Sequence, residues 1–463
     1  MFFKEDFMSG EKKISHHVSF KKIFMLAYPA ILSMLSFNIM QFVDRYFVAQ
    51  YNLTQFSAIM PSGIYAMTVT SIFMGIVGYV SALVSQYYGA RKYKECSKSL
   101  WQSIYLAILF AVIFIITLPI TSMVFDLLKH SENLLKYEKQ YFSLSIFAAC
   151  FHLFINAFSG FFSGTGDTKT PMLTSIVANL LNIFLDWIFV FGKFGFPEMG
   201  IFGAGLATVL SAFIGLLLLI LFTFKKRILL KYRVYKHLNF DKEILFKMVK
   251  FGFPAGFQFF LAIGGMSIFM LLIGKMGEIN LTSANIALTI ESLSFMPIIG
   301  LSVAIGIISG QEKGAERVHN IPRAVKNGLI IAFVYNIIMI IIFNLFPEIL
   351  ISIFDNGKEP EKFVMIKKYT LPLVRIASVW LFFDSIQIII GQVLKTMGDT
   401  VFLMIVTGIL PIFFMAIPTY LIGIVFNLPI MWIWFLLALF VFVLAVSMSL
   451  RFAFGKWREI NVI

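Results

Sequence analysis

The sequence predicts an all-α membrane protein with twelve transmembrane helices, built as two six-helix bundles related by a pseudo-two-fold axis along the membrane normal. Three observations predict this fold. Of the 463 residues, 59% are apolar and only 13% are charged, whereas soluble domains carry about 25% charged residues. The charges lie in short clusters between apolar runs, each long enough to cross a hydrocarbon core about 30 Å thick as a helix. The sequence also repeats itself once.

The apolar runs show no sign of the short alternating strands of a membrane β-barrel. The residues before the first run are polar and include Lys12, Lys13, His16 and His17, so we expect an uncleaved first anchor rather than a signal peptide. We predict spans at residues 22–49, 56–87, 100–125, 142–164, 171–192, 201–224, 246–274, 283–310, 324–346, 369–394, 401–424 and 429–452.

The net charge of +14 is explained by the way the protein crosses the membrane. Most Lys and Arg residues fall in the segments that share a side with the N-terminus, which is the positive-inside pattern. We therefore predict a multi-pass protein of a plasma or bacterial inner membrane with both termini in the cytoplasm. The bilayer accounts for the composition, and no nucleic-acid partner is predicted.

Three short segments recur in the same order. Residues 27–30 read Ala-Tyr-Pro-Ala and residues 252–255 read Gly-Phe-Pro-Ala, while residues 85–90 match residues 310–315 at the same spacing. The third match joins Gly166-Asp167-Thr168 to Gly398-Asp399-Thr400 at a slightly larger spacing, and the extra residues are expected around Asn356 to Glu361. Each half therefore holds six spans and enters the membrane from the same side.

The repeat divides the chain into five parts. These are a cytoplasmic N-terminal segment (1–21), an N-terminal bundle (22–224), a basic cytoplasmic linker (225–245) in which a surface helix can form, a C-terminal bundle (246–453) and a cytoplasmic tail (454–463). Two bundles that face each other can rock and expose a site to each side in turn. This arrangement favours a transporter over a channel or a structural membrane protein.

Acidic residues inside the spans are the candidate functional groups. An ionisable side chain at membrane depth costs about 2.5–3.5 kcal/mol, so it needs a partner or a function. Four acids qualify, and Asp44 and Asp186 lie at a similar depth in the N-terminal bundle, level with Asn182 and Thr208. These four oxygen-bearing side chains could bind Na⁺, which prefers oxygen ligands, or one carboxylate could take up a proton. The other two acids are Glu291 and Asp384.

Structural roles are the alternatives at these positions. Asp44 could form a buried ion pair with Arg45 or Arg375, although adjacent helical residues do not face each other. Asn182 and Thr208 could pair helices by hydrogen bonds, and His152, which corresponds to Asp384 in the repeat, could be a packing residue.

Pro29 and Pro254 begin the first and seventh spans. Proline removes a backbone hydrogen bond from a membrane helix and permits a kink. Each proline could mark a bend that gates access to the site, or it could mark a static kink.

Several ordered motifs carry a resemblance to a known family. They lie at Gln41-Phe42-Val43-Asp44, Gln86-Tyr87-Tyr88-Gly89-Ala90-Arg91, Asn182-Ile183-Phe184-Leu185-Asp186-Trp187, Gly203-Ala204-Gly205-Leu206-Ala207-Thr208, Ile290-Glu291-Ser292-Leu293-Ser294-Phe295-Met296-Pro297 and Asp384-Ser385-Ile386-Gln387. In this order and spacing, over nearly the whole chain, the sequence resembles the multidrug and toxic compound extrusion (MATE) transporters of the multidrug/oligosaccharidyl-lipid/polysaccharide exporter superfamily.

The resemblance implies roles for the candidate residues. It implies that Asp44, Asn182, Asp186 and Thr208 form the cation-coupling site, and that Glu291, Asp384 and Gln387 form a substrate or second cation site. It also implies a Na⁺- or H⁺-coupled antiporter that exports amphipathic organic cations, acting as a monomer. A lipid-linked oligosaccharide flippase of the same superfamily is the alternative.

Some positions depart from the family pattern. Arg45 stands where a small residue is usual, and Ala49-Gln50 replaces a nearby glycine. Ala262 stands where some branches carry a seventh-span Glu, with Gln258 nearby, so a Na⁺ site of that branch's type is in doubt. The sequence has no phosphate-binding loop and no hydrolase or metalloprotease motif, so neither an enzyme nor a cofactor besides the coupling ion is predicted.

Overall fold

The computed structural model describes residues 19–128, 130–355 and 360–463, and the described part is helical without β-strands. It contains 12 helical segments that are long and apolar enough to cross a membrane, which confirms the predicted fold class. The α-helices are α1 (Phe20–Tyr51), α2 (Leu53–Gly78), α3 (Val80–Gly89), α4 (Tyr93–Ser122), α5 (Glu132–Gly164), α6 (Lys169–Phe191), α7 (Ile201–Thr223), α8 (Lys226–Tyr232), α9 (Lys242–Lys275), α10 (Glu278–Gly314), α11 (Ile321–Leu345), α12 (Pro347–Ser352), α13 (Pro360–Met397), α14 (Thr400–Pro411), α15 (Ile417–Tyr420) and α16 (Ile430–Phe454).

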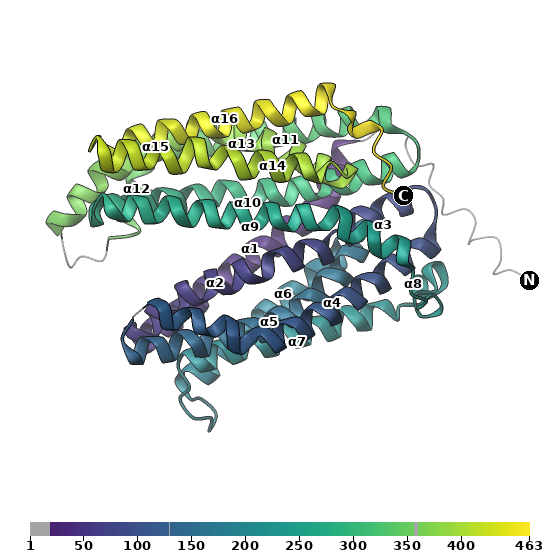
Figure 1. The fold of residues 1–463 in the computed structure, drawn as a ribbon, viewed down its shortest axis with the longest axis horizontal. Coiled ribbons are helices and arrows are strands. Elements are labelled where there is room, and N and C mark those ends of the chain that lie inside the picture. Colours follow the sequence, from purple (N-terminus) through teal and green to yellow (C-terminus); the bar gives the residue numbers. More distant parts are fainter. Residues whose placement is uncertain (1–18, 129, 356–359) are drawn as a thin grey trace, which may run out of the picture.

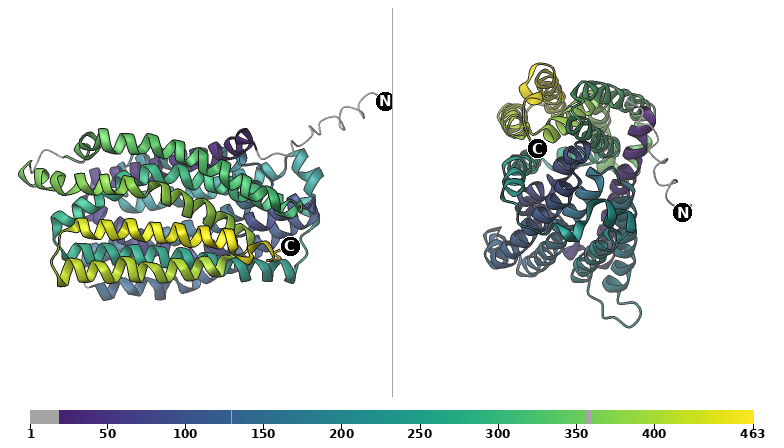
Figure 2. Two further views of the ribbon diagram at one scale, coloured as in Figure 1. Left: turned by 90° about the horizontal axis from the view of Figure 1, so that it is seen from above. Right: turned by 90° about the vertical axis from the view of Figure 1, so that its right-hand side faces the viewer.

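Helices α1–α7 form one bundle, the N-half, and α9–α16 form a second bundle, the C-half (Figure 1). The helix packing is equivalent in the two halves: α1 packs on α6 as α9 packs on α14, α2 on α5 as α10 on α13, and α5 on α7 as α13 on α16. The halves meet through α1, α2 and α3 on one side and α9 and α10 on the other. In Figure 1 their ribbons lie together at the end where the described chain begins and ends, here called the termini end, and diverge toward the opposite end. Figure 2 shows that the helices of both halves run along the same long axis.

The internal repeat is also visible in the turns. Gly166 and Gly398, which the sequence repeat pairs, both adopt positive φ, at 89° and 92°. Arg91 and Glu316, another equivalent pair, have φ of 59° and 60°. Residues with a side chain rarely adopt positive φ. The two halves therefore share the same unusual turns.

Helix ends follow local capping chemistry. The side chain of Asn52 accepts a hydrogen bond from the backbone N–H of Gln55 at 3.0 Å and begins α2. Gly192 ends α6 in the left-handed conformation. Several helices extend beyond the predicted spans, such as α5, which begins at Glu132 rather than near residue 142, because their first turns are polar enough to be missed by hydropathy.

The predicted eleventh span is interrupted. Two π-helical segments, Ile412–Ala416 and Leu421–Val425, follow α14 and α15. Pro411 and Pro418 lie in this region and lack a backbone N–H, which disfavours regular α-helical bonding.

Residues 356–359 of the predicted insertion and residues 1–18 of the predicted N-terminal segment lie outside the described residues.

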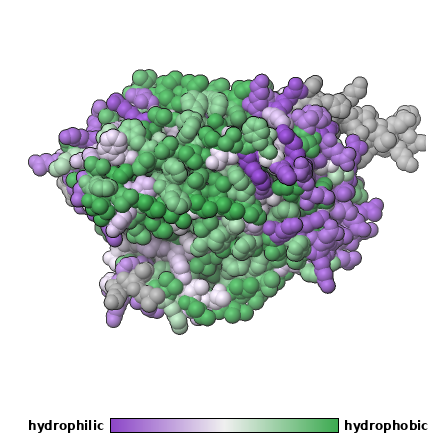
Figure 3. Space-filling view, turned by 45° about the horizontal axis from the view of Figure 1, so that its top comes forward, coloured by the Kyte–Doolittle hydropathy of each residue, from purple (hydrophilic) through white to green (hydrophobic). Residues whose placement is uncertain are grey.

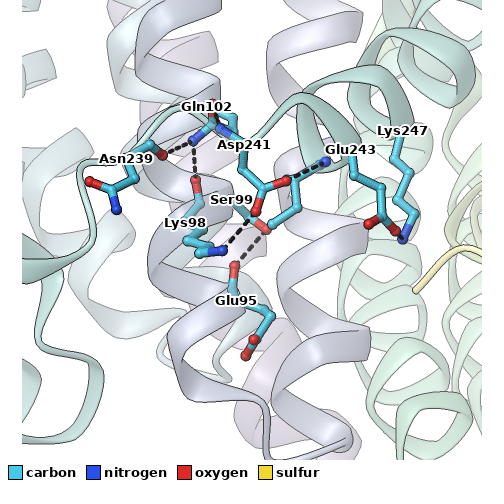
Figure 4. Close-up of polar contacts among 9 residues, drawn as sticks. Glu95, Lys98, Ser99, Gln102, Asn239, Asp241, Glu243 and Lys247 are labelled. Atoms are coloured by element: carbon cyan, nitrogen blue, oxygen red, sulfur yellow. Dashed lines mark hydrogen bonds and ion pairs between the residues drawn. The ribbon is translucent and has the colours of Figure 1, made fainter.

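The linker packs against α4, and this contact is here called the α4 clasp. Lys98 Nζ lies 2.7 Å from Asp241 Oδ2. Gln102 donates to the backbone oxygen of Asn239 at 3.1 Å and accepts from the backbone N–H of Asp241 at 3.1 Å (Figure 4). The indole of Trp101 donates to the backbone oxygen of Val234 at 2.7 Å. A helix of the N-half therefore fixes the residues that lead into α9 of the C-half.

The outer surface suits a bilayer. Large apolar side chains such as Ile116 (69% exposed), Leu271 (71%) and Val379 (61%) are exposed on helices of both halves. Figure 3 shows a broad apolar belt with hydrophilic residues gathered toward the two ends. The protein is therefore a multi-pass membrane protein.

Candidate functional site

Asp44 lies within α1, with its side chain buried against α5. The hydroxyl of Tyr141 donates to Asp44 Oδ2 at 3.3 Å. The other oxygen, Oδ1, is buried and has no hydrogen-bond partner in the described part of the chain. The carboxylate is thus only half satisfied by the protein.

Asp186 and Asn182 lie one helical turn apart on α6 and face Thr208 of α7. In one orientation of its amide, Asn182 donates to Thr208 Oγ1 at 3.4 Å. In the other, its nitrogen donates to Asp186 Oδ2 at 3.1 Å and its oxygen accepts from the backbone N–H of Thr208 at 3.2 Å. The second orientation satisfies both amide atoms, and it leaves Asp186 Oδ1 buried without a partner among the described residues.

The structure therefore brings all four predicted residues of the N-half together and adds Tyr141. We call these five residues the N-half site. The charges of Asp44 and Asp186 are close enough to interact. Two like charges in a buried environment are unfavourable unless a proton or a cation offsets them.

The donor set is suitable for a hard monovalent cation. Carboxylate, amide and hydroxyl oxygens are the ligands that such ions prefer, and the two unpartnered oxygens belong to Asp44 and Asp186. Within the described ranges, no group of three or more His, Cys, Asp or Glu side chains could hold a metal ion. Oxygen ligands of this kind suit hard cations, whereas imidazole and thiolate ligands suit transition metals.

A second pair of acids lies in the C-half. Glu291 of α10 accepts from the indole N–H of Trp380 at 2.6 Å, and Asp384 of α13 accepts from Gln387 at 3.2 Å. The charges of Glu291 and Asp384 also interact. We call Glu291, Trp380, Asp384 and Gln387 the C-half site, and each half of the molecule thus carries two neighbouring intramembrane carboxylates.

The alternative ion pairs of Asp44 do not form. Arg45 is exposed and donates to Gln41 at 3.3 Å, one turn earlier on α1. Arg375 is exposed on α13. His152 is partly buried on α5. Among the described residues neither Arg forms a salt bridge with these acids, although the charge of Arg45 acts on Asp44 from a distance.

Two contact residues were absent from the sequence-based set. Trp380 lies four residues before Asp384, so helical spacing could have placed it on the same face. Tyr141 is 97 residues from Asp44 along the chain. No local pattern links those two residues, and only the packing of the helices within the N-half reveals the contact.

The halves are joined at the termini end by a contact that we call the seam. Gln86 of the N-half donates to the backbone oxygen of Thr396 in the C-half at 2.7 Å. Its repeat equivalent, Gln311 of the C-half, donates to the backbone oxygen of Gly164 in the N-half at 3.1 Å. The two hydrogen bonds are related by the pseudo-two-fold axis.

Glycines allow the backbones at the seam to approach closely. A Cβ on Gly89 would overlap the carbonyl oxygen of Gln311, and a Cβ on its equivalent, Gly314, would overlap the carbonyl oxygen of Gln86. The predicted gating prolines, Pro29 of α1 and Pro254 of α9, are buried in the two helices that flank this contact.

Comparisons with known proteins agree with this architecture. The MatE family model matches residues 29–188 and 254–421, one segment in each half. A probable multidrug resistance protein NorM from Thermotoga maritima is 29% identical over 455 residues, which cover 96% of this chain and 94% of that protein. The multidrug resistance protein NorM of Vibrio cholerae is 25% identical over 379 residues, covering 81% of each chain.

A solved structure shares the fold. It is described as the outward-facing conformation of a multidrug resistance MATE family transporter, and it superposes with a TM-score of 0.85 at 21% identity. The superposition covers 94% of this chain and 96% of that one.

Proposed function

The chain belongs to the MatE family of multidrug efflux transporters, and we propose that it is an antiporter that couples the inward movement of Na⁺ or H⁺ to the export of amphipathic organic cations. One observation carries this proposal. Each half holds a pair of intramembrane carboxylates, and Asp44 and Asp186 each keep one buried oxygen without a protein partner. A bound cation or a proton would offset the remaining charge at such a position.

In this proposal, coupling arises because the cation binds the two arrangements of the halves with different affinity. A cation at the N-half site is useful only if it binds one arrangement of the two halves more tightly than the other, because a ligand shifts an equilibrium by its differential affinity. The acids of the C-half site, with the indole of Trp380 beside them, offer negative charge and an aromatic surface to an organic cation. In this proposal both termini are cytoplasmic, so the closed seam faces the cytoplasm, and a single chain is sufficient for transport.

Transport in proteoliposomes tests the proposal. Export of a cationic dye is measured under separate Na⁺ and H⁺ gradients for wild type, Asp44→Asn and Asp384→Asn. We expect one gradient to drive export in the wild type and both variants to lose most of it. Asp126→Asn is the matched control, because Asp126 is exposed and pairs with Lys139. Wild-type rates in both site variants would refute the assignments, and dye movement without either gradient would indicate a channel.

A further inference from the structure

A small cavity lies within the seam, and its walls come from both halves. Its volume is about 50 Å³, which is room for one small ion or for one or two water molecules. The polar residues that line it are Tyr79, Ser81 and Ser85 of the N-half and Gln392, Lys395 and Thr396 of the C-half.

Lys395 is the only charged residue among those that line the cavity. It lies near the end of α13. Within the described ranges, its ammonium group makes no hydrogen bond, ion pair or aromatic contact, and no carboxylate opposes it. Lys395 is half-buried, and negative charge beside its ammonium group would offset the cost of taking that charge out of water.

Two of the other polar side chains of the cavity already donate to backbone oxygens of their own helices, Ser85 to Ala82 at 2.8 Å and Thr396 to Gln392 at 2.9 Å. The side chains of Gln392 and Ser81 form no hydrogen bond with the described residues. The buried hydroxyl of Tyr79 likewise lacks a partner there. Glu312 of α10 does not line the cavity, and it pairs with Arg317 at 2.9 Å. An ammonium group surrounded by free amide and hydroxyl donors is the chemistry of an anion site.

We propose that this cavity binds a monovalent anion of about the size of chloride, with Lys395 as its counter-ion. Because the walls come from both halves, the anion meets its full set of ligands only while the seam is closed. Its binding therefore favours the closed seam, since a ligand stabilises the state that it binds more tightly. The repeat equivalent of Lys395 is Ser163, so the pseudo-symmetry provides one such cationic position and not two.

Anion exchange on spin-labelled protein in nanodiscs tests the proposal. Labels at Lys94→Cys and Lys326→Cys report the separation of the halves at the termini end, since both positions are exposed. The native Cys96 and Cys150 are buried and should stay unlabelled. When chloride replaces gluconate at constant ionic strength, we expect the ratio of closed to open molecules to rise about tenfold, the effect of one charge-assisted hydrogen bond.

Variants and a heavier halide complete the test. Lys395→Gln should abolish the chloride effect, and Lys456→Gln, at an exposed position, should preserve it. Crystals grown in bromide should show anomalous density beside Lys395. Equal distance distributions in chloride and gluconate, or bromide crystals without that density, would mean that the cavity holds water only and would overturn the proposal. Both of these measurements use the wild-type side chains of the cavity, so the test survives a variant that fails to fold.

Discussion

At the scale of single residues, the two acid sites differ in how the protein satisfies them. In the N-half site, Asp44 receives one hydrogen bond from Tyr141, and one oxygen of each carboxylate remains without a protein partner. In the C-half site, Glu291 and Asp384 each receive a side-chain hydrogen bond. The N-half site therefore has the greater unmet demand for a cation, which is why we assign coupling to it.

Tyr141→Phe should weaken coupling without removing a carboxylate. The hydroxyl donates to Asp44 at 3.3 Å, and a hydrogen bond to a charged group contributes about 1.5–3 kcal/mol. Because this bond orients the carboxylate that binds the cation, we expect the coupling-ion concentration at half-maximal transport to rise about tenfold. Transport measured against ion concentration provides the check, with Tyr137→Phe, one turn away on α5, as control. An unchanged half-maximal concentration would remove Tyr141 from the site.

At the scale of helices, the α4 clasp decides how the two halves are connected. Lys98, Trp101 and Gln102 lie on one face of α4 and bind the linker through its backbone and the side chain of Asp241. Figure 4 shows the contacts of Lys98 and Gln102. The linker contains the short helix α8, which agrees with the surface helix that its composition allows. The start of α9 is thus held by a helix of the opposite half.

Acid should loosen the α4 clasp. Lys98 donates to Asp241 and holds the pKa of that carboxyl below its usual value of about 3.9. The pair therefore stabilises the clasp above that value, and the stability is lost as the pH falls through the lowered pKa. Because the pair is partly exposed, we expect an effect of about 0.5–1 kcal/mol.

The mobility of a spin label at Asn239→Cys measures this effect. In the wild-type background the label should gain mobility only at about pH 4 and below. In Lys98→Met it should be more mobile at neutral pH and respond little to acid, whereas Lys247→Met, which breaks the exposed pair with Glu243, should behave as wild type. A label whose response to acid is the same with and without Lys98 would contradict this account.

At the scale of the whole molecule, the seam follows from the duplication. Two hydrogen bonds from Gln86 and Gln311, and two close approaches at Gly89 and Gly314, are exchanged between the halves by the pseudo-two-fold axis. Because glycine has no Cβ, the backbones can meet where any other residue would separate them. The repeated segment at residues 85–90 and 310–315 is therefore an interface between the halves.

Gly89→Ala and Gly314→Ala should force the seam apart. Each added Cβ would overlap a backbone oxygen of the opposite half, and backbone atoms cannot move aside as a flexible side chain can. We expect the labels at residues 94 and 326 to report a larger open population in each variant and a still larger one in the double variant. Gly63→Ala is the matched control, since its Cβ would meet nothing within 4 Å. Unchanged distances in the double variant would show that the seam does not govern closure.

The sequence by itself determined the twelve spans, the duplication and the intramembrane acids, because a bilayer imposes long apolar runs and makes buried charge conspicuous. It also placed Asn182 and Asp186 on one helical face by their spacing. Only the tertiary structure decided that Tyr141 reaches Asp44, that Trp380 reaches Glu291, and that Lys395 lies in a cavity between the halves. Such contacts join helices far apart in the chain, and periodicity within one helix carries no information about which other helix it meets.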